Sequence, residues 1–406
     1  MSLFKISIVT IVLVTALMGL GIYFYPLAEK LYTLVTLGDP DKIAANLQGM
    51  EKVADHYVIA KSSAPYPLPK AEQGFVLPGR FESLGRKFDT KVFLANSQSM
   101  GMLILHKGQI IYEKYEHGLT ESTTSLVFSV SKSFTSALVG LAIADGYIDS
   151  EHDPVVKYLP DLKGAGYEKA TIADCLEMSS GVKFLERHDG SETDMDRFKR
   201  HFALGRPIMD FLKTIGPDKK PGTYNGYNSL DAQVAGMVVD AAIGERTLSE
   251  YLQEKIWQPL GMEHDAQWLK DGIEVELSLG GLNVTLRHMA KFGLLFLQEG
   301  KWNGKQIIPA AWIEESTNPD APHLMPGRDN PLSSKIWGYK YLWWIPLTRF
   351  GGDYLASGLH DQYIYINPEK SLVIAKISSN YRYTEDPENW KEHHIGLFQT
   401  IARSMD

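Results

Sequence analysis

The sequence predicts an α+β domain, in which helices flank an antiparallel sheet and a mainly helical region is inserted between its strands. Three observations favour this class: strand-like segments occur early, at 102–115, they recur late, at 339–377, and helical patterns fill most of the chain between them. Such segregation is typical of a sheet that both ends of a domain complete. With 406 residues, of which 44% are hydrophobic and 22% charged, the chain can bury a large core.

The N-terminal residues 6–25 contain no charged side chain and are long enough to cross a bilayer as a helix. This run exceeds the apolar core of a signal peptide, so we expect an N-terminal transmembrane helix that contacts the membrane through residues 6–25. Lys5 favours a cytoplasmic N-terminus. We therefore expect a single-pass inner (cytoplasmic) membrane protein whose large domain faces the periplasm or cell exterior. The alternative is a secreted or periplasmic protein after signal cleavage.

Three parts follow along the chain. Residues 1–26 are the expected anchor, and residues 27–89, with a possible short helix at 41–56 and a Pro-rich stretch, are expected to form a tether and wrapping segment. Residues 90–406 are expected to form the main domain. At its start, apolar runs on either side of Lys107 and Gly108 predict a β-hairpin over 102–115.

The helix expected over Phe128–Tyr147 has apolar residues at helical spacing and ends at Asp145 and Gly146. Residues 182–220 are polar and charged, and we expect loops there. Further elements follow from the same periodicities. Helices are expected at 171–178, 232–242, 286–299, 310–315 and 390–404, and strands at 339–345, 363–367 and 371–377.

Composition argues against several classes of function. The net charge is −8 and no long basic run occurs, so we expect no nucleic-acid partner. Neither a metal-ligand spacing nor a phosphate-binding glycine loop is present, so no metal and no cofactor are expected. Cys175 is the only cysteine, and its apolar surroundings predict a buried structural thiol rather than a nucleophile.

Ser129 and Lys132 open the expected helix at 128–147. Residues three apart lie one turn apart on one helix face, so the amine could take the proton of the hydroxyl. The same Ser-x-x-Lys spacing also occurs at Ser2 and at Ser180. The motif alone therefore leaves a polar helix start as an alternative reading.

Three segments, taken in order, narrow the choice: FSVSK at 128–132, PGTYNGYNS at 221–229 and ASGLHDQYIYINP at 356–368. Together they resemble the serine β-lactamase and penicillin-binding hydrolase superfamily, specifically its class C-like branch. Within that branch the chain is similar to 6-aminohexanoate-dimer hydrolases and related esterases. The resemblance covers about residues 90 to 402 and implies a β-lactamase/transpeptidase-like fold.

The resemblance also implies an acyl-enzyme mechanism. Ser129 would be the nucleophile, Lys132 would accept its proton, and Tyr227 would be a second base, whose phenolate a nearby lysine makes more accessible. The backbone amides of Ser129 and Leu359 would form the oxyanion hole. Four further positions are expected to contact the substrate: Ser229, Ser357, Gly358 and His360.

Two departures from the family pattern bear on the substrate. Ser229 replaces an asparagine, and Ala356 stands where penicillin-recognising members carry a Lys or His that holds a carboxylate. We therefore expect a serine hydrolase of small amides or esters. The alternatives are a non-hydrolysing acyl-binding sensor or scaffold, and a peptidoglycan D-Ala-D-Ala carboxypeptidase or β-lactamase. The oligomeric state stays open.

Overall fold

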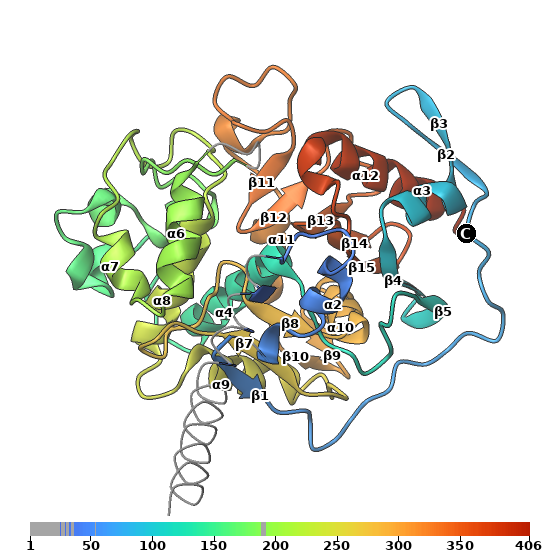
Figure 1. Ribbon diagram of the computed structural model, residues 1–406, viewed down its shortest axis with the longest axis horizontal. Coiled ribbons are helices and arrows are strands. Elements are labelled where there is room, and N and C mark those ends of the chain that lie inside the picture. Colours follow the sequence, from blue (N-terminus) through green and yellow to red (C-terminus); the bar gives the residue numbers. More distant parts are fainter. Residues whose placement is uncertain (1–24, 26–28, 30–31, 34–35, 53, 188–191) are drawn as a thin grey trace, which may run out of the picture.

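A seven-stranded antiparallel sheet lies at the centre of the computed structural model, which describes residues 25, 29, 32–33, 36–52, 54–187 and 192–406 (Figure 1). The strand order is β11-β12-β13-β14-β15-β4-β5. Strand β15 pairs with β4, so the two ends of the domain complete one sheet, as the sequence predicts. The strands are β4 (Ser99–His106), β5 (Gln109–Tyr115), β11 (Gly338–Lys340), β12 (Trp343–Ile345), β13 (Tyr354–Gly358), β14 (Gln362–Asn367) and β15 (Leu372–Ser378).

The predicted hairpin is formed by β4 and β5, which the turn at Lys107 and Gly108 joins. Both turn residues have positive φ, 50° and 78°, and such two-residue turns match the natural twist of paired strands. The expected strand over 339–345 is instead two strands, because Tyr341 and Leu342 adopt φ values of 38° and 66°. The Leu342 carbonyl accepts a hydrogen bond from the Ser133 hydroxyl at 2.9 Å, which ties this turn to the neighbouring helix.

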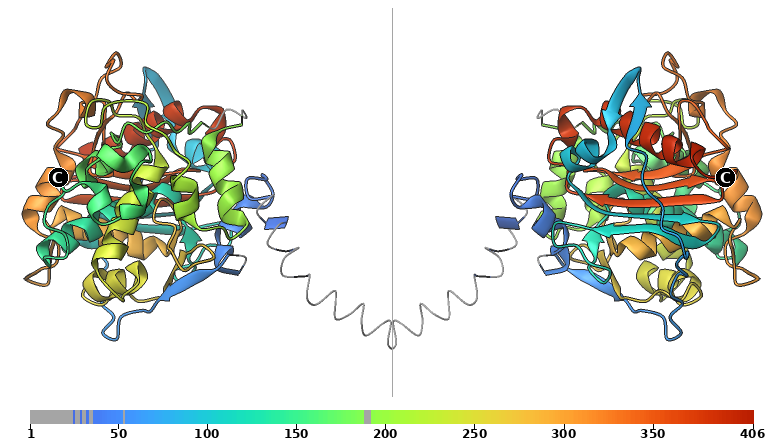
Figure 2. Two further views of the ribbon diagram at one scale, coloured as in Figure 1. Left: turned by 90° about the vertical axis from the view of Figure 1, so that its left-hand side faces the viewer. Right: turned by 90° about the vertical axis from the view of Figure 1, so that its right-hand side faces the viewer.

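Helices cover both faces of the sheet (Figure 2). Helix α10 (Leu286–Leu297) packs so closely that a Cβ on its Gly293 would lie 2.6 Å from Val373 and 2.8 Å from Ile364. Helix α12 (Pro387–Arg403) packs the Phe398 ring 5.6 Å from the ring of Tyr363. Adjacent residues of a strand point to opposite faces, so α10 and α12 lie on opposite sides of β14.

The region between β5 and β11 is mainly helical, and the buried helices α4 and α8 pack together within it. Besides α10 and α12, the α-helices of the described residues are α2 (Ile43–Leu47), α3 (Thr90–Asn96), α4 (Ser131–Ala144), α5 (Ile172–Leu176), α6 (Asp194–Ala203), α7 (Ile208–Leu212), α8 (Ser229–Ala242), α9 (Leu248–Leu252) and α11 (Ala310–Thr317). Helices α6 and α7 occupy the stretch where loops were expected. Cys175 is buried in α5, as predicted.

Smaller sheets complete the fold. One has the order β1-β7-β8-β6, and two are hairpins. The strands are β1 (His56–Ile59), β2 (Arg80–Ser83), β3 (Arg86–Asp89), β6 (Ser125–Leu126), β7 (Ala266–Leu269), β8 (Leu282–Val284), β9 (Lys301–Trp302) and β10 (Lys305–Gln306). The N-terminal segment joins the main domain at several places. Strand β1 pairs with β7, Ser62 and Tyr66 hydrogen-bond to Met262 and Gly261, and residues 71–75 hydrogen-bond to β5.

The predicted membrane anchor is not supported. Residues 1–24 lie outside the described residues, and in the part of the chain that is described no helix is both long and apolar enough to span a bilayer. The expectation of a transmembrane helix, and of the inner-membrane location that followed from it, is corrected on this finding. The helix expected over 41–56 is also shorter, because α2 ends at Leu47 and β1 begins at His56.

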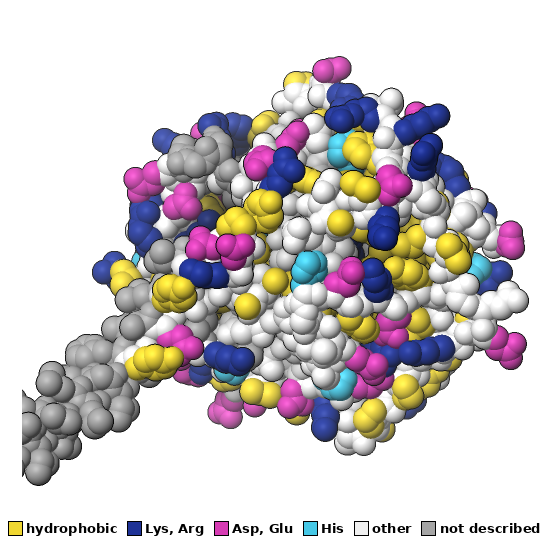
Figure 3. Space-filling view, turned by 45° about the vertical axis from the view of Figure 1, so that its right-hand side comes forward, with side chains coloured by type: hydrophobic (Ala, Val, Ile, Leu, Met, Phe, Trp, Pro, Cys, Tyr) yellow, Lys and Arg dark blue, Asp and Glu magenta, His cyan; other side chains and the backbone are white. Residues whose placement is uncertain are grey.

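Charges of both signs are interspersed on the face of the molecule shown in Figure 3. The short basic cluster in α6 is likewise balanced by acids. Arg197 pairs with Asp194 at 2.7 Å, and Lys199 pairs with Asp196 at 3.2 Å. Each pair joins residues one helical turn apart, which is the arrangement of a solvated helix face.

Candidate active site

Ser129 and Lys132 meet at the start of α4. A 3₁₀ turn, Phe128–Val130, runs directly into the helix, so both side chains belong to one helical segment. The Lys132 Nζ donates a hydrogen bond to the Ser129 Oγ at 2.7 Å. Phe128 has a φ of 47°, which is uncommon for a bulky residue, and its ring packs 5.4 Å from the ring of His360. The serine is therefore held on a tight turn against an amine.

The environment of Lys132 makes the neutral, proton-accepting form of this amine accessible near neutral pH. The side chain is 1% exposed, and Nζ also donates to the Leu279 carbonyl oxygen at 2.5 Å. Burial lowers the pKa of Lys132 to about 8, and the negative charge of Glu186 opposes this shift in part. At pH 7 roughly one molecule in ten then carries a neutral amine, against less than one in a thousand for an ordinary lysine.

Tyr227 lies between Lys132 and Trp344. The Lys132 Nζ is 5.5 Å from the centroid of the Tyr227 ring, and Trp344 stacks on that ring with centroids 5.2 Å apart. The chain is anchored just after Tyr227, where Asn228 caps α8 by accepting a hydrogen bond from the Leu230 amide and also donates to Asp231. The cap and the stacked ring fix Tyr227 beside the Ser129–Lys132 pair.

The protonation of Tyr227 differs from the sequence expectation. Burial raises the pKa of Tyr227 well above its usual range, and the charge of Glu186 raises it further. Interactions with Ser129 and Ser229 offset only part of this rise. The phenolate that a lysine neighbour was expected to favour is therefore disfavoured, and Tyr227 is a neutral phenol that can donate a hydrogen bond.

The end of β13 runs against the Ser129 turn. A Cβ on Gly358 would lie 2.5 Å from the Val127 carbonyl oxygen and 3.3 Å from the Ser129 nitrogen, so only glycine allows this approach. Leu359 follows on the surface of the same cleft as Ser129. A shared oxyanion hole formed by the Ser129 and Leu359 amides requires this proximity.

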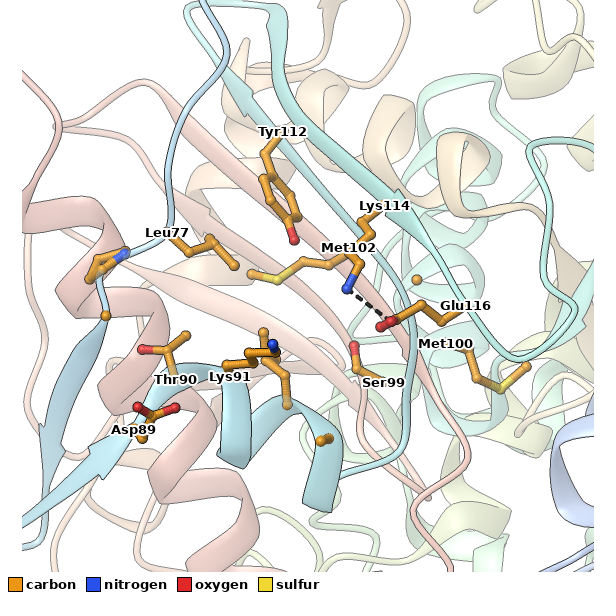
Figure 4. A pocket seen from close by; sticks show the side chains of 15 residues that line it. Leu77, Asp89, Thr90, Lys91, Ser99, Met100, Met102, Tyr112, Lys114 and Glu116 are labelled. Carbon is orange, nitrogen blue, oxygen red and sulfur yellow. Dashed lines mark hydrogen bonds and ion pairs between the residues drawn. The ribbon is translucent and has the colours of Figure 1, made fainter.

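A cleft of about 1100 Å³ opens at Ser129. We call it the Ser129 cleft; its lining includes Ser129, Tyr227 and Leu359, with residues from 178–187, 334–344 and 383–391. A separate cavity of about 300 Å³ lies over β4 and β5, where Tyr112 and Met102 face the start of α3 (Figure 4). The described residues that line this smaller cavity include none of the predicted site residues, so the Ser129 cleft is the candidate site.

Of the four residues predicted to contact the substrate, two line the Ser129 cleft and two are hydrogen-bonded to protein neighbours. Ser357 and Gly358 line the Ser129 cleft. Ser229 is buried, and its hydroxyl donates to the Glu186 Oε1 at 2.9 Å while its amide donates to Oε2 at 2.8 Å. The His360 Nδ1 donates to the Asn380 carbonyl oxygen at 2.8 Å, so this nitrogen faces the protein rather than the cleft. Ser229 and His360 are therefore occupied by neighbours.

Ser180 shows why the Ser-x-x-Lys spacing alone is not specific. Its hydroxyl donates to the Asp231 Oδ1 at 2.6 Å, whereas Lys183 is exposed. Tyr167 donates to the same Asp231 oxygen, and burial raises the pKa of Asp231 to about 7. Ser180 therefore stabilises a buried carboxyl and lacks an amine partner such as Lys132.

The side chains of the Ser129 cleft that sequence reasoning missed include Glu186, Trp344 and Lys391. Glu186 lies in the polar stretch 182–220, where no motif distinguishes it from solvated neighbours. Trp344 was read only as part of a strand. Lys391 lies in the C-terminal helix, and no local pattern signals that its amine faces a cleft.

The comparison with known families decides the assignment. The family model for beta-lactamases matches residues 90–397. The chain belongs to the beta-lactamase family. Members of this family are hydrolytic, so the protein is a beta-lactamase-family serine hydrolase, as the three ordered motifs predict.

Two relatives of this beta-lactamase-family enzyme carry different names. A 6-aminohexanoate-dimer hydrolase from Paenarthrobacter ureafaciens is 25% identical over 337 residues, which cover 80% of this chain and 84% of the relative. A beta-lactamase from Escherichia coli K12 is 22% identical and covers 70% of this chain and 84% of its own length.

Solved structures agree with this assignment. A Bacillus anthracis protein, described provisionally as a 6-aminohexanoate-dimer hydrolase, has a TM-score of 0.79 at 26% identity and covers 90% of this chain and 95% of its own. A class C beta-lactamase in complex with cefoxitin has a TM-score of 0.54 at 14% identity, with coverages of 76% and 96%. The second likeness shows the shared fold.

Proposed function

We propose that this beta-lactamase-family enzyme hydrolyses a small amide or ester through an acyl-enzyme on Ser129. The observation that carries the proposal is the 2.7 Å hydrogen bond between Lys132 and Ser129, because burial lowers the pKa of that lysine to about 8. We assign the activity to residues 90–406, with residues 27–89 as a segment that wraps this domain.

Acylation would begin when the neutral Lys132 amine takes the proton from the Ser129 hydroxyl. The Ser129 Oγ attacks the carbonyl carbon, and the carbonyl π electrons move onto oxygen to form a tetrahedral oxyanion. The amides of Ser129 and Leu359 would donate hydrogen bonds to this oxyanion. Fixed backbone donors of this kind stabilise the transition state because they need no reorganisation during the reaction.

Collapse of the intermediate would break the bond to the leaving group. A departing amine needs a proton, and the neutral Tyr227 phenol can supply it while Tyr227 recovers a proton from the Lys132 ammonium. Water would then attack the acyl carbon, and its proton would pass through Tyr227 to Lys132. Lys132 would return a proton to the Ser129 oxygen as the acyl bond breaks, which releases the acid and restores the Ser129 hydroxyl.

The strand position that holds a penicillin's carboxylate in penicillin-recognising members is uncharged in this chain. Ala356 offers no charge on β13, and it is buried in the sheet. One relative is named a 6-aminohexanoate-dimer hydrolase, which supports an amide substrate. Another is named a beta-lactamase, so a chromogenic cephalosporin belongs in the substrate panel.

Intact-mass measurement tests the proposal. The protein is mixed with a p-nitrophenyl ester and sampled from milliseconds to hours. We expect a burst of one p-nitrophenolate per active site, an acyl adduct that peptide mapping places on Ser129, and then steady turnover. An adduct that persists for hours without further product would instead indicate the sensor or scaffold. Folded protein that is not acylated would refute the proposal.

Replacement of Tyr227 tests its role as a proton donor. We expect Tyr227→Phe to lower kcat for an amide substrate about 100-fold, because an amine leaves poorly without a proton. For a p-nitrophenyl ester we expect a loss of less than about tenfold, since p-nitrophenolate leaves unprotonated. The ratio of the two losses is the measurement.

The matched control is Tyr339→Phe. The Tyr339 ring packs edge-on against Tyr227, with centroids 6.1 Å apart, and it is buried. Removal of this hydroxyl should change amide and ester turnover by the same small factor. Equal losses for both substrates in Tyr227→Phe would argue against proton donation by Tyr227.

A further inference from the structure

Lys391 of α12 brings a basic amine to the lining of the Ser129 cleft. Its side chain is only 5% exposed, and its Nζ lies 3.5 Å from the centroid of a Trp344 ring and 4.2 Å from that of Trp337. The two indoles meet edge to face, with centroids 5.7 Å apart, so the amine occupies the corner between them. Indole faces attract a cation and exclude water from it.

The acids next to Lys391 are engaged elsewhere. Glu392 accepts a hydrogen bond from the Trp337 indole and faces Arg328, and Glu388 faces the Lys335 Nζ at 3.8 Å. Across the residues that the structure describes, Lys391 has neither a hydrogen-bond nor an ion-pair partner. A buried amine without a hydrogen-bond partner is costly for a folded protein. Because this amine lies at the wall of an open cleft, a ligand bound in the cleft could supply the missing hydrogen-bond partner.

We propose that Lys391 binds a carboxylate of the substrate, so that the enzyme selects amides or esters that carry an anionic group away from the scissile bond. This inference rests on the proposed function, and it names the substrate class. Ala356 leaves β13 without a cation, and Lys391 of α12 brings to the same cleft an amine that can take up a proton and pair with a carboxylate. Trp344 stacks on Tyr227, so the anion site lies one indole ring beyond the reacting groups.

Binding of an anion to Lys391 is coupled to protonation of its amine. Burial lowers the pKa of Lys391 well below its usual range, and Lys335 lowers it further. The charges of Glu388, Glu392 and Asp361 oppose this shift only in part. A bound carboxylate restores the charged form of the amine, and a hydrogen bond between two charged groups is the strong kind.

Two matched pairs of substrates test the proposal on the full chain. One pair places the carboxylate on the acyl side: mono-p-nitrophenyl adipate against its methyl ester. The other places it on the leaving side: 4-(butyryloxy)benzoate against 4-(butyryloxy)benzamide. We expect the wild-type kcat/KM to favour at least one carboxylate over its neutral partner by about 10- to 100-fold, as charge-assisted hydrogen bonds do. In Lys391→Met this preference should vanish, while rates for the neutral partners change less than about threefold.

Lys335→Met is the charge control, since it removes a positive charge near the same acids, and it should leave the preference intact. Lys391→Arg keeps the charge and should retain part of the preference. If wild type shows no preference in either pair, or if Lys391→Met slows carboxylate and neutral substrates equally, the proposal is wrong.

A binding measurement separates this proposal from the proposed function. Calorimetry on Ser129→Ala protein, with hexanoate against hexanamide, does not require acyl transfer. We expect hexanoate to bind about tenfold more tightly, and this difference to disappear in Ser129→Ala/Lys391→Met. Equal affinities for the two ligands would refute the anion site even in an active enzyme. Loss of Ser129 acylation with this difference intact would refute only the proposed function.

Discussion

Ser129→Ala is expected to lower kcat for a p-nitrophenyl ester by about 10⁴-fold or more, because removal of a nucleophile leaves only binding and oxyanion stabilisation. The substitution removes one oxygen atom and the partner of the 2.7 Å hydrogen bond from Lys132. Because Lys132 keeps the Leu279 carbonyl as a partner, the fold should survive. Steady-state kinetics, fluorophosphonate labelling and a thermal unfolding curve form the measurement.

Ser180→Ala is the matched control, since Ser180 shares the Ser-x-x-Lys spacing and lines the same cleft. Its hydroxyl donates to buried Asp231, so its loss should cost about 1–3 kcal/mol of stability and leave Ser129 open to labelling. If Ser129→Ala kept its activity within about tenfold, or if a fluorophosphonate labelled both serine variants, Ser129 would not be the nucleophile.

Local geometry made part of the site predictable from the sequence. Residues three apart in a helix lie on one face, so Ser129 and Lys132 had to approach each other once the helix formed. Lys107 and Gly108 likewise favour the tight turn between β4 and β5. Tyr227 and Leu359 lie far from Ser129 along the chain, and only the resemblance carried by three ordered family motifs predicted them as site residues.

Features that depend on tertiary packing escaped prediction. The protonation of Tyr227 was misjudged because Glu186 approaches it from a stretch without any motif, and because burial opposes the phenolate. Tyr341 and Leu342 read as strand residues, yet contacts with neighbouring helices hold them in a turn.

Lys391 is the clearest case of this limit. An amphipathic pattern predicts a helix at the C-terminus, but a lysine in such a helix is normally solvated. Trp337 and Trp344, from the segment at 334–344, contribute to its burial by packing against its amine. The substrate specificity that we infer therefore depends on an arrangement in space that has no counterpart in the local sequence.

Lys132→Met should lower kcat/KM about 10³- to 10⁴-fold, because methionine keeps most of the side-chain volume but cannot accept a proton. The pH profile gives the sharper readout. Burial holds the pKa of Lys132 at about 8 in the free enzyme, and the neutral amine is the active form. The kcat/KM of wild type should therefore rise tenfold per pH unit below about 8 and level off above it. The raised pKa of Tyr227 keeps its ionisation above this range.

Lys376→Met is the control for that profile. Lys376 on β15 is also buried, its pKa is also lowered to about 8, and its amine donates to a serine, Ser378. It is a buried Lys–Ser pair away from the Ser129 cleft, so its loss should weaken the fold but leave the rise below pH 8 in place. Lys132→Met should abolish that rise in whatever activity remains. If the rise persisted in Lys132→Met and vanished in Lys376→Met, a group other than Lys132 would be the base, because an amine that accepts the Ser129 proton cannot be replaced by a thioether.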